Sequence, residues 1–269
     1  MSLAYFVTAH KNPQQVGRLL RAIQGKSMVV HYDLKAPEKD RREMAEIVAK
    51  VPGAHLAKTP RKVEWAAWSL VQAELDGIRE LLETDSSWTH FIPLSGQCFP
   101  LVRPEVVEAF SESHPGQSFL ELFDAETVWG AGETKARYRR AHTRRGRRRI
   151  SLPIPLPPLD AQIFGASQWK ILSREACAYL IGPETAPLRR HFQRTWVPDE
   201  AYFATALMTS PLAPRTQAAH KHYIDWSTPN PPKILGMEDL PKLEASEAFF
   251  ARKLEPGDLL DLLEQRLRT

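Results

Sequence analysis

The sequence predicts an α/β protein with a mostly parallel central sheet flanked by helices. Strands and helices alternate along the first hundred residues, which is the pattern of βαβ units. The predicted strands are continuous apolar runs rich in β-branched and aromatic residues, as expected for a sheet covered on both faces. The composition is that of a soluble globular chain, with 43% hydrophobic and 25% charged residues among 269. We therefore expect one domain over residues 1–269.

The first predicted strand covers residues 3–9, an apolar run that ends at His10. Pro13 favours the start of a helix whose apolar residues recur at helical spacing until Gly25. The other elements predicted in this half are a strand at 27–32, a helix at 37–50, a strand at 55–57, a helix at 68–82 and a strand at 88–94.

Polar residues follow three of these strands where each one ends. They are His10, Asp33 and the Ser95–Gly96 pair. In parallel sheets, ligands bind outside the carboxyl ends of the strands. Each residue taken alone is equally compatible with an ordinary loop position, but the three together favour a binding site at one rim of the sheet.

The second half of the chain is less regular. Ser173 is a predicted N-cap, with Glu175 in the first turn of the helix that follows. The arginine-rich run 137–149 and the proline-rich run 151–160 together predict a long exposed loop, because proline excludes a helix or a central strand. The remaining expected elements are strands at 118–123, 163–172 and 222–226, and helices at 173–180, 201–208, 241–250 and 258–267.

The cysteine content and the apolar segments bear on the compartment. Cys98 and Cys177 are the only cysteines, so no disulfide framework is expected and a reducing setting is favoured. No run approaches the roughly 18–20 apolar residues that cross a bilayer. The first nine residues lack the basic leader and long apolar centre of a signal peptide. These features predict a cytoplasmic protein.

Eight arginines fall within the thirteen residues 137–149, although the net charge of the chain is only +4. Dense positive charge binds nucleic acid phosphates, anionic lipids or acidic acceptors, and it also occurs on solvated surface loops. Tyr138 is the only aromatic residue in the run, so base stacking is poorly supplied. Nucleic acid is therefore not the expected partner.

Several familiar motifs are missing from the sequence. It contains no GxxxxGK[ST] loop, no GxGxxG fingerprint, no HExxH and no Asp-X-Asp pair. A diphosphate would therefore have to be neutralised by lysine or arginine rather than by a carboxylate-held cation. Asp199 and Glu200 stand at the start of a predicted helix, where a favourable charge–dipole interaction and a general base are both open interpretations.

The chain resembles the core-2/I-branching β-1,6-N-acetylglucosaminyltransferase family, which is related to the peptide O-xylosyltransferases. The resemblance extends nearly end to end and rests on pieces in the family's order: AYFVTAHKNPQQVGRLLRAI, VVHYDLKAP, VEWAAWSLVQAELDGIREL, WTHFIPLSGQCFPL, GASQWKILSREACAYLI, TWVPDEAYFATAL, HYIDWS, PPKIL and FFARKLEP. It implies a GT-A type fold and an inverting sugar transfer from a UDP-sugar without a divalent cation or another cofactor. The eukaryotic members carry disulfides and a membrane anchor, so a chain with neither fits a bacterial, cytoplasmic relative.

The resemblance also implies roles for individual residues. Glu200, in the PDE motif, corresponds to the catalytic base. Lys253, in FARK, corresponds to a diphosphate ligand, and Lys233 is the nearest basic residue for the second such ligand. The other implied donor-site residues are Asp33, His10, Trp65 and Ser69, and the implied acceptor-site residues are Glu121, Arg137 and Trp226.

These expectations combine into one predicted activity and one alternative. The enzyme moves N-acetylglucosamine or xylose from UDP to a hydroxyl of a glycan or lipid-linked acceptor in bacterial glycan synthesis. Its nucleotide-binding half covers about residues 1–125 and its acceptor-binding and catalytic half about 126–269. Residues 137–149 contact an anionic membrane at its inner face. The alternative is a nucleic-acid or anionic-surface binding protein on an inactive transferase scaffold.

Overall fold

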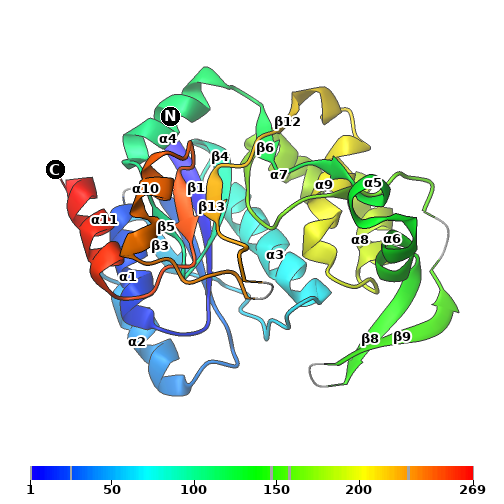
Figure 1. Ribbon diagram of the computed structural model, residues 1–269, viewed down its shortest axis with the longest axis horizontal. Coiled ribbons are helices and arrows are strands. Elements are labelled where there is room, and N and C mark those ends of the chain that lie inside the picture. The colour runs from blue at the N-terminus through cyan, green and yellow to red at the C-terminus, as the bar shows by residue number, and fades with distance from the viewer. Residues whose placement is uncertain (1, 25, 146–147, 157–158, 229–230, 269) are drawn as a thin grey trace.

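The computed structural model describes residues 2–24, 26–145, 148–156, 159–228 and 231–268. Its centre is a seven-stranded sheet in the order β12-β6-β11-β4-β1-β2-β3, with helices on both faces (Figure 1). Strand β1 pairs in parallel with β2 and β4, and β2 pairs in parallel with β3. Strand β11 is antiparallel to both β4 and β6. The α/β class with a mostly parallel sheet is therefore confirmed.

The first half follows the predicted alternation closely. Pro13 occupies the first turn of α1, where its missing N–H costs no hydrogen bond. The elements are β1 (Ser2–Ala9), α1 (Pro13–Ala22), β2 (Ser27–Tyr32), α2 (Glu38–Val48), β3 (Ala54–Leu56), α3 (Trp68–Thr84), β4 (Trp88–Ser95), β5 (Phe99–Pro100), α4 (Pro104–Ser113) and β6 (Ser118–Leu120).

The second half completes the sheet and adds helices beside it. The predicted cap is confirmed, because the Ser173 hydroxyl accepts from the Ala176 N–H at 3.1 Å. The elements are β7 (Phe123–Asp124), α5 (Ala125–Trp129), α6 (Ala131–Tyr138), β8 (Arg140–Arg145), β9 (Arg148–Pro155), β10 (Phe164–Gly165), β11 (Lys170–Ser173), α7 (Arg174–Ile181), η1 (Pro183–Thr185), α8 (Ala186–Phe192), η2 (Pro198–Glu200), α9 (Tyr202–Met208), η3 (Ala213–Arg215), β12 (Thr216–Ala218), β13 (His222–Ile224), η4 (Met237–Asp239), α10 (Leu240–Glu244), β14 (Phe250–Arg252) and α11 (Asp258–Arg268).

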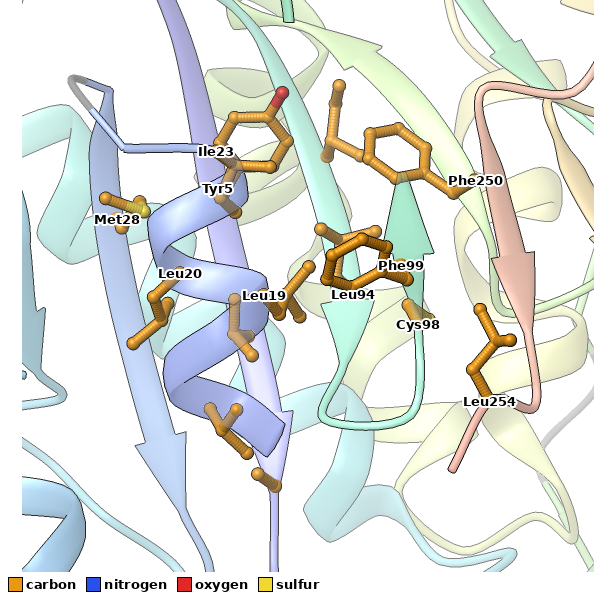
Figure 2. Packing of buried hydrophobic residues seen from close by; sticks show 14 of the residues in the cluster. Tyr5, Leu19, Leu20, Ile23, Met28, Leu94, Cys98, Phe99, Phe250 and Leu254 are labelled. Atoms are coloured by element: carbon orange, nitrogen blue, oxygen red, sulfur yellow. The ribbon is translucent and has the colours of Figure 1, made fainter. Parts of the chain in front are cut away.

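Two hydrophobic cores cover the two faces of the sheet. Successive side chains of a strand point to opposite faces, so Tyr5 belongs to one core and Phe6 to the other. In the first core, Tyr5 meets the ring of Phe250 edge to face, with 6.3 Å between the ring centroids. Figure 2 shows Tyr5 and Phe250 in this core, together with Leu19 and Leu20 of α1, which packs against β1. Phe99 and Leu254 lie nearby. Each core combines residues from both halves of the sequence, so the halves do not fold around separate interiors.

Several predicted elements differ in the structure. The strand expected over 163–172 is divided into β10 and β11, which belong to different sheets, and the strand expected over 118–123 ends at Leu120. The loop expected over residues 137–160 contains the end of α6 and an antiparallel hairpin of β8 and β9, and residues 146–147 between these strands lie outside the described residues. Proline is tolerated in β9 because a two-stranded hairpin consists of edge strands only. The helix expected over 241–250 is wrong, since α10 ends at Glu244. The aromatic Phe250 instead enters β14, in a small sheet with β13 and β5.

Within the described ranges, no helix combines the length and the apolar character needed to cross a membrane.

Candidate active site

A pocket of about 770 Å³ opens at the carboxyl ends of β1, β2 and β4. Because these strands are parallel, the residues that follow them meet at one edge. His10, Asp33 and Ser95–Gly96 all line this pocket, so the predicted rim is confirmed as a structural feature. The wall also takes Gln168, Arg252 and Lys253 from the second half of the chain.

Asp33 organises the pocket wall after β2. One of its carboxylate oxygens accepts from the Lys35 N–H at 2.7 Å, and the other accepts from the Val63 N–H at 3.2 Å. The side chain is buried, and both backbone bonds fix its direction. His31, also in the wall, accepts from the Arg61 N–H at 2.9 Å. These contacts hold the 61–65 segment against the end of β2.

The positive end of α1 faces the same pocket. Lys11 before the helix, its N-cap Asn12 and Gln15 in its first turn contribute to the wall. The N-terminus of a helix favours anions because its backbone N–H groups and its dipole point toward them. Lys11 forms an ion pair of 2.9 Å with Glu255, which joins this end of α1 to the segment after β14. Burial and the neighbouring Lys11 lower the pKa of His10.

Two adjacent cations enter the pocket from the end of β14. The Arg252 guanidinium lies 4.3 Å from the ring centroid of Trp169, and burial lowers its pKa. Its Nε is closed off from solvent and has no hydrogen-bond partner among the described residues. Burial and the neighbouring Arg252 also lower the pKa of Lys253. Uncompensated cations of this kind are stabilised when an anion enters.

Lys233 is placed differently from the sequence-based expectation. Its ammonium lies 2.7 and 2.8 Å from the two carboxylate oxygens of Asp239 and 3.0 Å from Glu238. Asp239 is only 1% exposed, and a buried carboxylate needs a cation close by. Lys233 is not among the described residues of the pocket wall. Its backbone contacts the pocket-wall residue Lys253 instead, because the Lys253 N–H donates to the Lys233 carbonyl at 3.5 Å.

Trp65 and Ser69 shape the opposite side of the pocket. Trp65 lines the pocket, is 66% exposed, and meets the ring of Trp196 edge to face at 5.9 Å. The Ser69 hydroxyl is not in the described wall. It accepts from the Glu64 N–H at 2.8 Å and so holds the loop before Trp65.

An unusual backbone junction joins this loop to the Pro198–Glu200 turn. Ala66 and Val197 both adopt positive φ, of 60° and 50°, and the Val197 N–H donates to the Ala66 carbonyl at 3.1 Å. Positive φ is an outlier for a β-branched residue, and such strain collects at functional sites. The junction brings the PDE motif next to a residue of the pocket wall.

Glu200 lies at the edge of this arrangement with a strongly perturbed carboxyl. One oxygen accepts from Arg137 Nη1 at 3.0 Å. Burial and the neighbouring Asp199 raise the pKa of Glu200 to about 7, against the opposing effect of Arg137. A carboxyl with this pKa takes up and releases a proton near neutral pH, which is the property a general base needs.

The other predicted acceptor residues lie at varying distance from this carboxyl. Arg137 is bonded directly to it and also stacks over Trp129 at 4.9 Å. Glu121 is exposed and interacts electrostatically with Glu200 and with His220. Trp226 is 59% exposed and lies shortly after β13. Its role stays a prediction.

Sequence reasoning missed several polar residues of the pocket wall, and three of them come from segments that it had singled out. They are Arg252, Lys11 and Gln168. Arg252 adjoins Lys253 in the FARK piece and Lys11 adjoins His10, so a search for paired cations next to each candidate would have found both. Gln168 carries no comparable signal. In the described part of the chain, no three His, Cys, Asp or Glu side chains gather in an arrangement suited to a metal ion.

The comparisons with known proteins identify the class and then the family. Curated relatives are transferases of sugars, which places the chain among the glycosyltransferases. Residues 3–248 match the family model "Core-2/I-Branching enzyme", and the chain belongs to this family. The mostly parallel sheet agrees with the GT-A type fold that this membership implies.

Two relatives differ in the sugar that their names specify, xylose in one and N-acetylglucosamine in the other. The chain is 28% identical to xylosyltransferase oxt of Drosophila melanogaster over 90% of its own length and 30% of that protein. It is also 28% identical to a mouse β-1,3-galactosyl-O-glycosyl-glycoprotein β-1,6-N-acetylglucosaminyltransferase 4, over 76% of this chain and 46% of that one. The chain thus spans about a third to a half of the length of these relatives.

A solved structure of mouse xyloside xylosyltransferase 1 aligns over 93% of this chain and 96% of its own, with a TM-score of 0.42 and 12% identity.

Proposed function

We propose that the protein is an inverting glycosyltransferase that moves a sugar from a UDP-sugar to an acceptor hydroxyl without a divalent cation. The observation that carries the proposal is the position of Glu200. Its carboxyl has a pKa of about 7, and the Val197 N–H just before its turn donates to the carbonyl of Ala66, next to Trp65 in the wall of the pocket. The relatives named as xylosyl- and N-acetylglucosaminyltransferases support xylose or N-acetylglucosamine as the transferred sugar.

The proposed chemistry needs one base and a set of cations. The acceptor hydroxyl gives its proton to the Glu200 carboxylate while its oxygen forms the bond to the anomeric carbon. The bond from that carbon to the diphosphate oxygen breaks on the opposite face, so the configuration inverts. UDP leaves with developing negative charge, which Arg252, Lys253 and the positive end of α1 stabilise.

UDP binding in the presence of a chelator tests the proposal and its alternative together. With EDTA present, UDP at ~100 times its Kd is expected to stabilise the protein by about 2.7 kcal/mol, seen as a higher Tm. No UDP effect, together with tight and strongly salt-dependent oligonucleotide binding, would instead support a nucleic-acid binding protein on an inactive scaffold. A UDP effect that appears only when Mg²⁺ is added would contradict metal independence.

We also propose that the β8–β9 hairpin contacts an anionic membrane while the site acts on a glycan or lipid-linked acceptor. The hairpin projects away from the sheet on the side of α6 (Figure 1), and its strands carry Arg144, Arg145, Arg148 and Arg149. Each basic residue near an anionic surface contributes about 1 kcal/mol.

Vesicle binding tests the membrane contact. The protein is expected to sediment with phosphatidylglycerol vesicles at low salt and not with neutral ones, because the attraction is electrostatic. Replacing these four arginines by Gln is expected to abolish sedimentation. Four matched replacements at Lys39, Arg42, Lys50 and Arg21, in or near α1 and α2, serve as the control. Equal vesicle binding by the hairpin variant and the wild type would reject the contact.

A further inference from the structure

We propose that Lys170 is a positioning residue for Glu200, because its buried ammonium ties the chain segment beside the pocket to the turn that carries the PDE motif. This inference rests on the proposed role of Glu200 as the base, and it adds a residue that does not touch either substrate. Three sets of contacts carry it: an ion pair inside the protein, a backbone connection to Glu200, and an electrostatic connection through Asp199.

The ion pair joins β11 to α3. Lys170 Nζ lies 2.8 Å from the Glu74 carboxylate, and the two side chains are only 1% and 3% exposed. The same ammonium sits 3.7 Å from the ring centroid of Phe203 on α9. Burying two charges costs several kcal/mol per ion, and a hydrophobic pair of similar volume is often as stable. Stability alone therefore does not account for a charged pair at this place.

The backbone connection runs along residues 166–170. Lys170 Nζ donates to the Gln168 carbonyl at 2.8 Å, and Gln168 lines the pocket. Two residues earlier, the Ala166 N–H donates to the Glu200 carbonyl at 2.8 Å. One short segment is thus held by Lys170 at one end and bonded to Glu200 at the other. A shift of Lys170 would therefore be passed through this segment to the Glu200 turn.

The electrostatic connection runs through Asp199. Its Oδ1 is closed off from solvent and has no hydrogen-bond partner among the described residues. Burial raises the pKa of Asp199, while Lys170 favours its charged form. A charged Asp199 in turn raises the pKa of Glu200. Removal of Lys170 therefore favours protonated Asp199, withdraws this repulsion and lowers the pKa of Glu200.

Lys170 and Glu200 each interact with several titratable groups. Among the described residues, the titratable groups that interact with Lys170 are Glu74 on α3, Asp199 in η2, Cys177 on α7 and His222 on β13. Glu74 also interacts with Asp199, which raises the pKa of Glu74. Those that interact with Glu200 are Asp199, Arg137, Glu121 and Tyr138.

The test removes the pair without leaving a lone buried charge. The double variant Lys170→Met with Glu74→Leu is expected to fold, to keep the wild-type UDP-induced rise in Tm, and to lose about tenfold in kcat with KM for the donor unchanged. The rising limb of its pH–rate profile is expected to move to lower pH. Lys170→Arg, which keeps the charge, is expected to keep the limb near its wild-type position. The matched control replaces the Arg18–Glu264 pair between α1 and α11 in the same way and is expected to leave the limb unmoved.

A titration of Glu200 by carboxyl ¹³C NMR separates this inference from the proposed function, because it needs no turnover. A lower Glu200 midpoint in the double variant supports the role of Lys170 even if the wild type transfers no sugar. The same midpoint in both proteins overturns it, even if the wild type is an active transferase. If the double variant fails to fold, Asp199→Asn tests the electrostatic connection by itself with the Lys170–Glu74 pair intact, and an unchanged Glu200 midpoint there overturns the inference.

Discussion

Replacing Glu200 by Gln is expected to lower kcat by about 10²-fold or more, the usual contribution of a general base. Glutamine has almost the same shape but does not accept a proton, and its amide oxygen still accepts from Arg137, which lies 3.0 Å from the native carboxylate. The surrounding turn is therefore expected to keep its conformation. Turnover of the best UDP-sugar found in a thermal-shift screen measures the loss, and the UDP-induced rise in Tm is expected to stay at its wild-type size.

The pH dependence of the wild type gives an independent check on the same residue. A general base works only when deprotonated, so the rate is expected to rise with pH through about 7, where burial and Asp199 place the pKa of Glu200. This limb is expected to disappear in the Gln variant. Glu133→Gln on α6, which removes the other carboxylate bonded to Arg137, is the matched control and is expected to keep the limb. Wild-type turnover in Glu200→Gln would reject the proposed base.

Replacing Lys253 by Met is expected to lower kcat/KM by about 10²-fold and to weaken UDP binding as well. The loss of a preorganised charge that faces a leaving group typically costs a factor of this size. Lys253 lines the pocket beside Arg252, and burial already lowers its pKa, so methionine fills the space without leaving a buried charge. Steady-state kinetics and the UDP-induced Tm shift both measure the effect.

The control for this prediction is Lys50→Met. Lys50 is exposed after α2 and is not part of the described pocket wall. Its replacement by methionine removes the same charge and is expected to leave the steady-state kinetics and UDP binding unaltered. Equal behaviour of the Lys253 and Lys50 variants would show that the pocket does not use Lys253 to hold the diphosphate.

The elements that the sequence predicted correctly are those with strong local signals. The apolar run 3–9 became β1, and Pro13 and Ser173 stand at the helix starts where they were expected. The edge of a parallel sheet follows from this alternation, which is why His10, Asp33 and Ser95 could be predicted to line one pocket.

The errors arose where distant contacts decide the structure. The Phe249–Phe250 pair continues a pattern compatible with a helix, but Phe250 packs on Tyr5 and pairs with β5, both far away in the sequence. The resemblance offered Lys233, in PPKIL, as the second diphosphate ligand, and that role stays a prediction. The ion pair of Lys233 with the buried Asp239 could not be predicted from the sequence, because it depends on where the side chains lie.

Arg252 and Lys253, the two cations of the pocket wall at the end of β14, are synthesised long after the strands beside which they lie. The strands that form the floor of the pocket lie within the first hundred residues, whereas Arg252 and Lys253 come near the end of the chain. Chains emerge from the ribosome N-terminal end first, and distant pairings form late. A nascent chain therefore exposes the edge of the sheet until residue 253 has been made, so an anion that depends on Arg252 and Lys253 can assist folding only after that point.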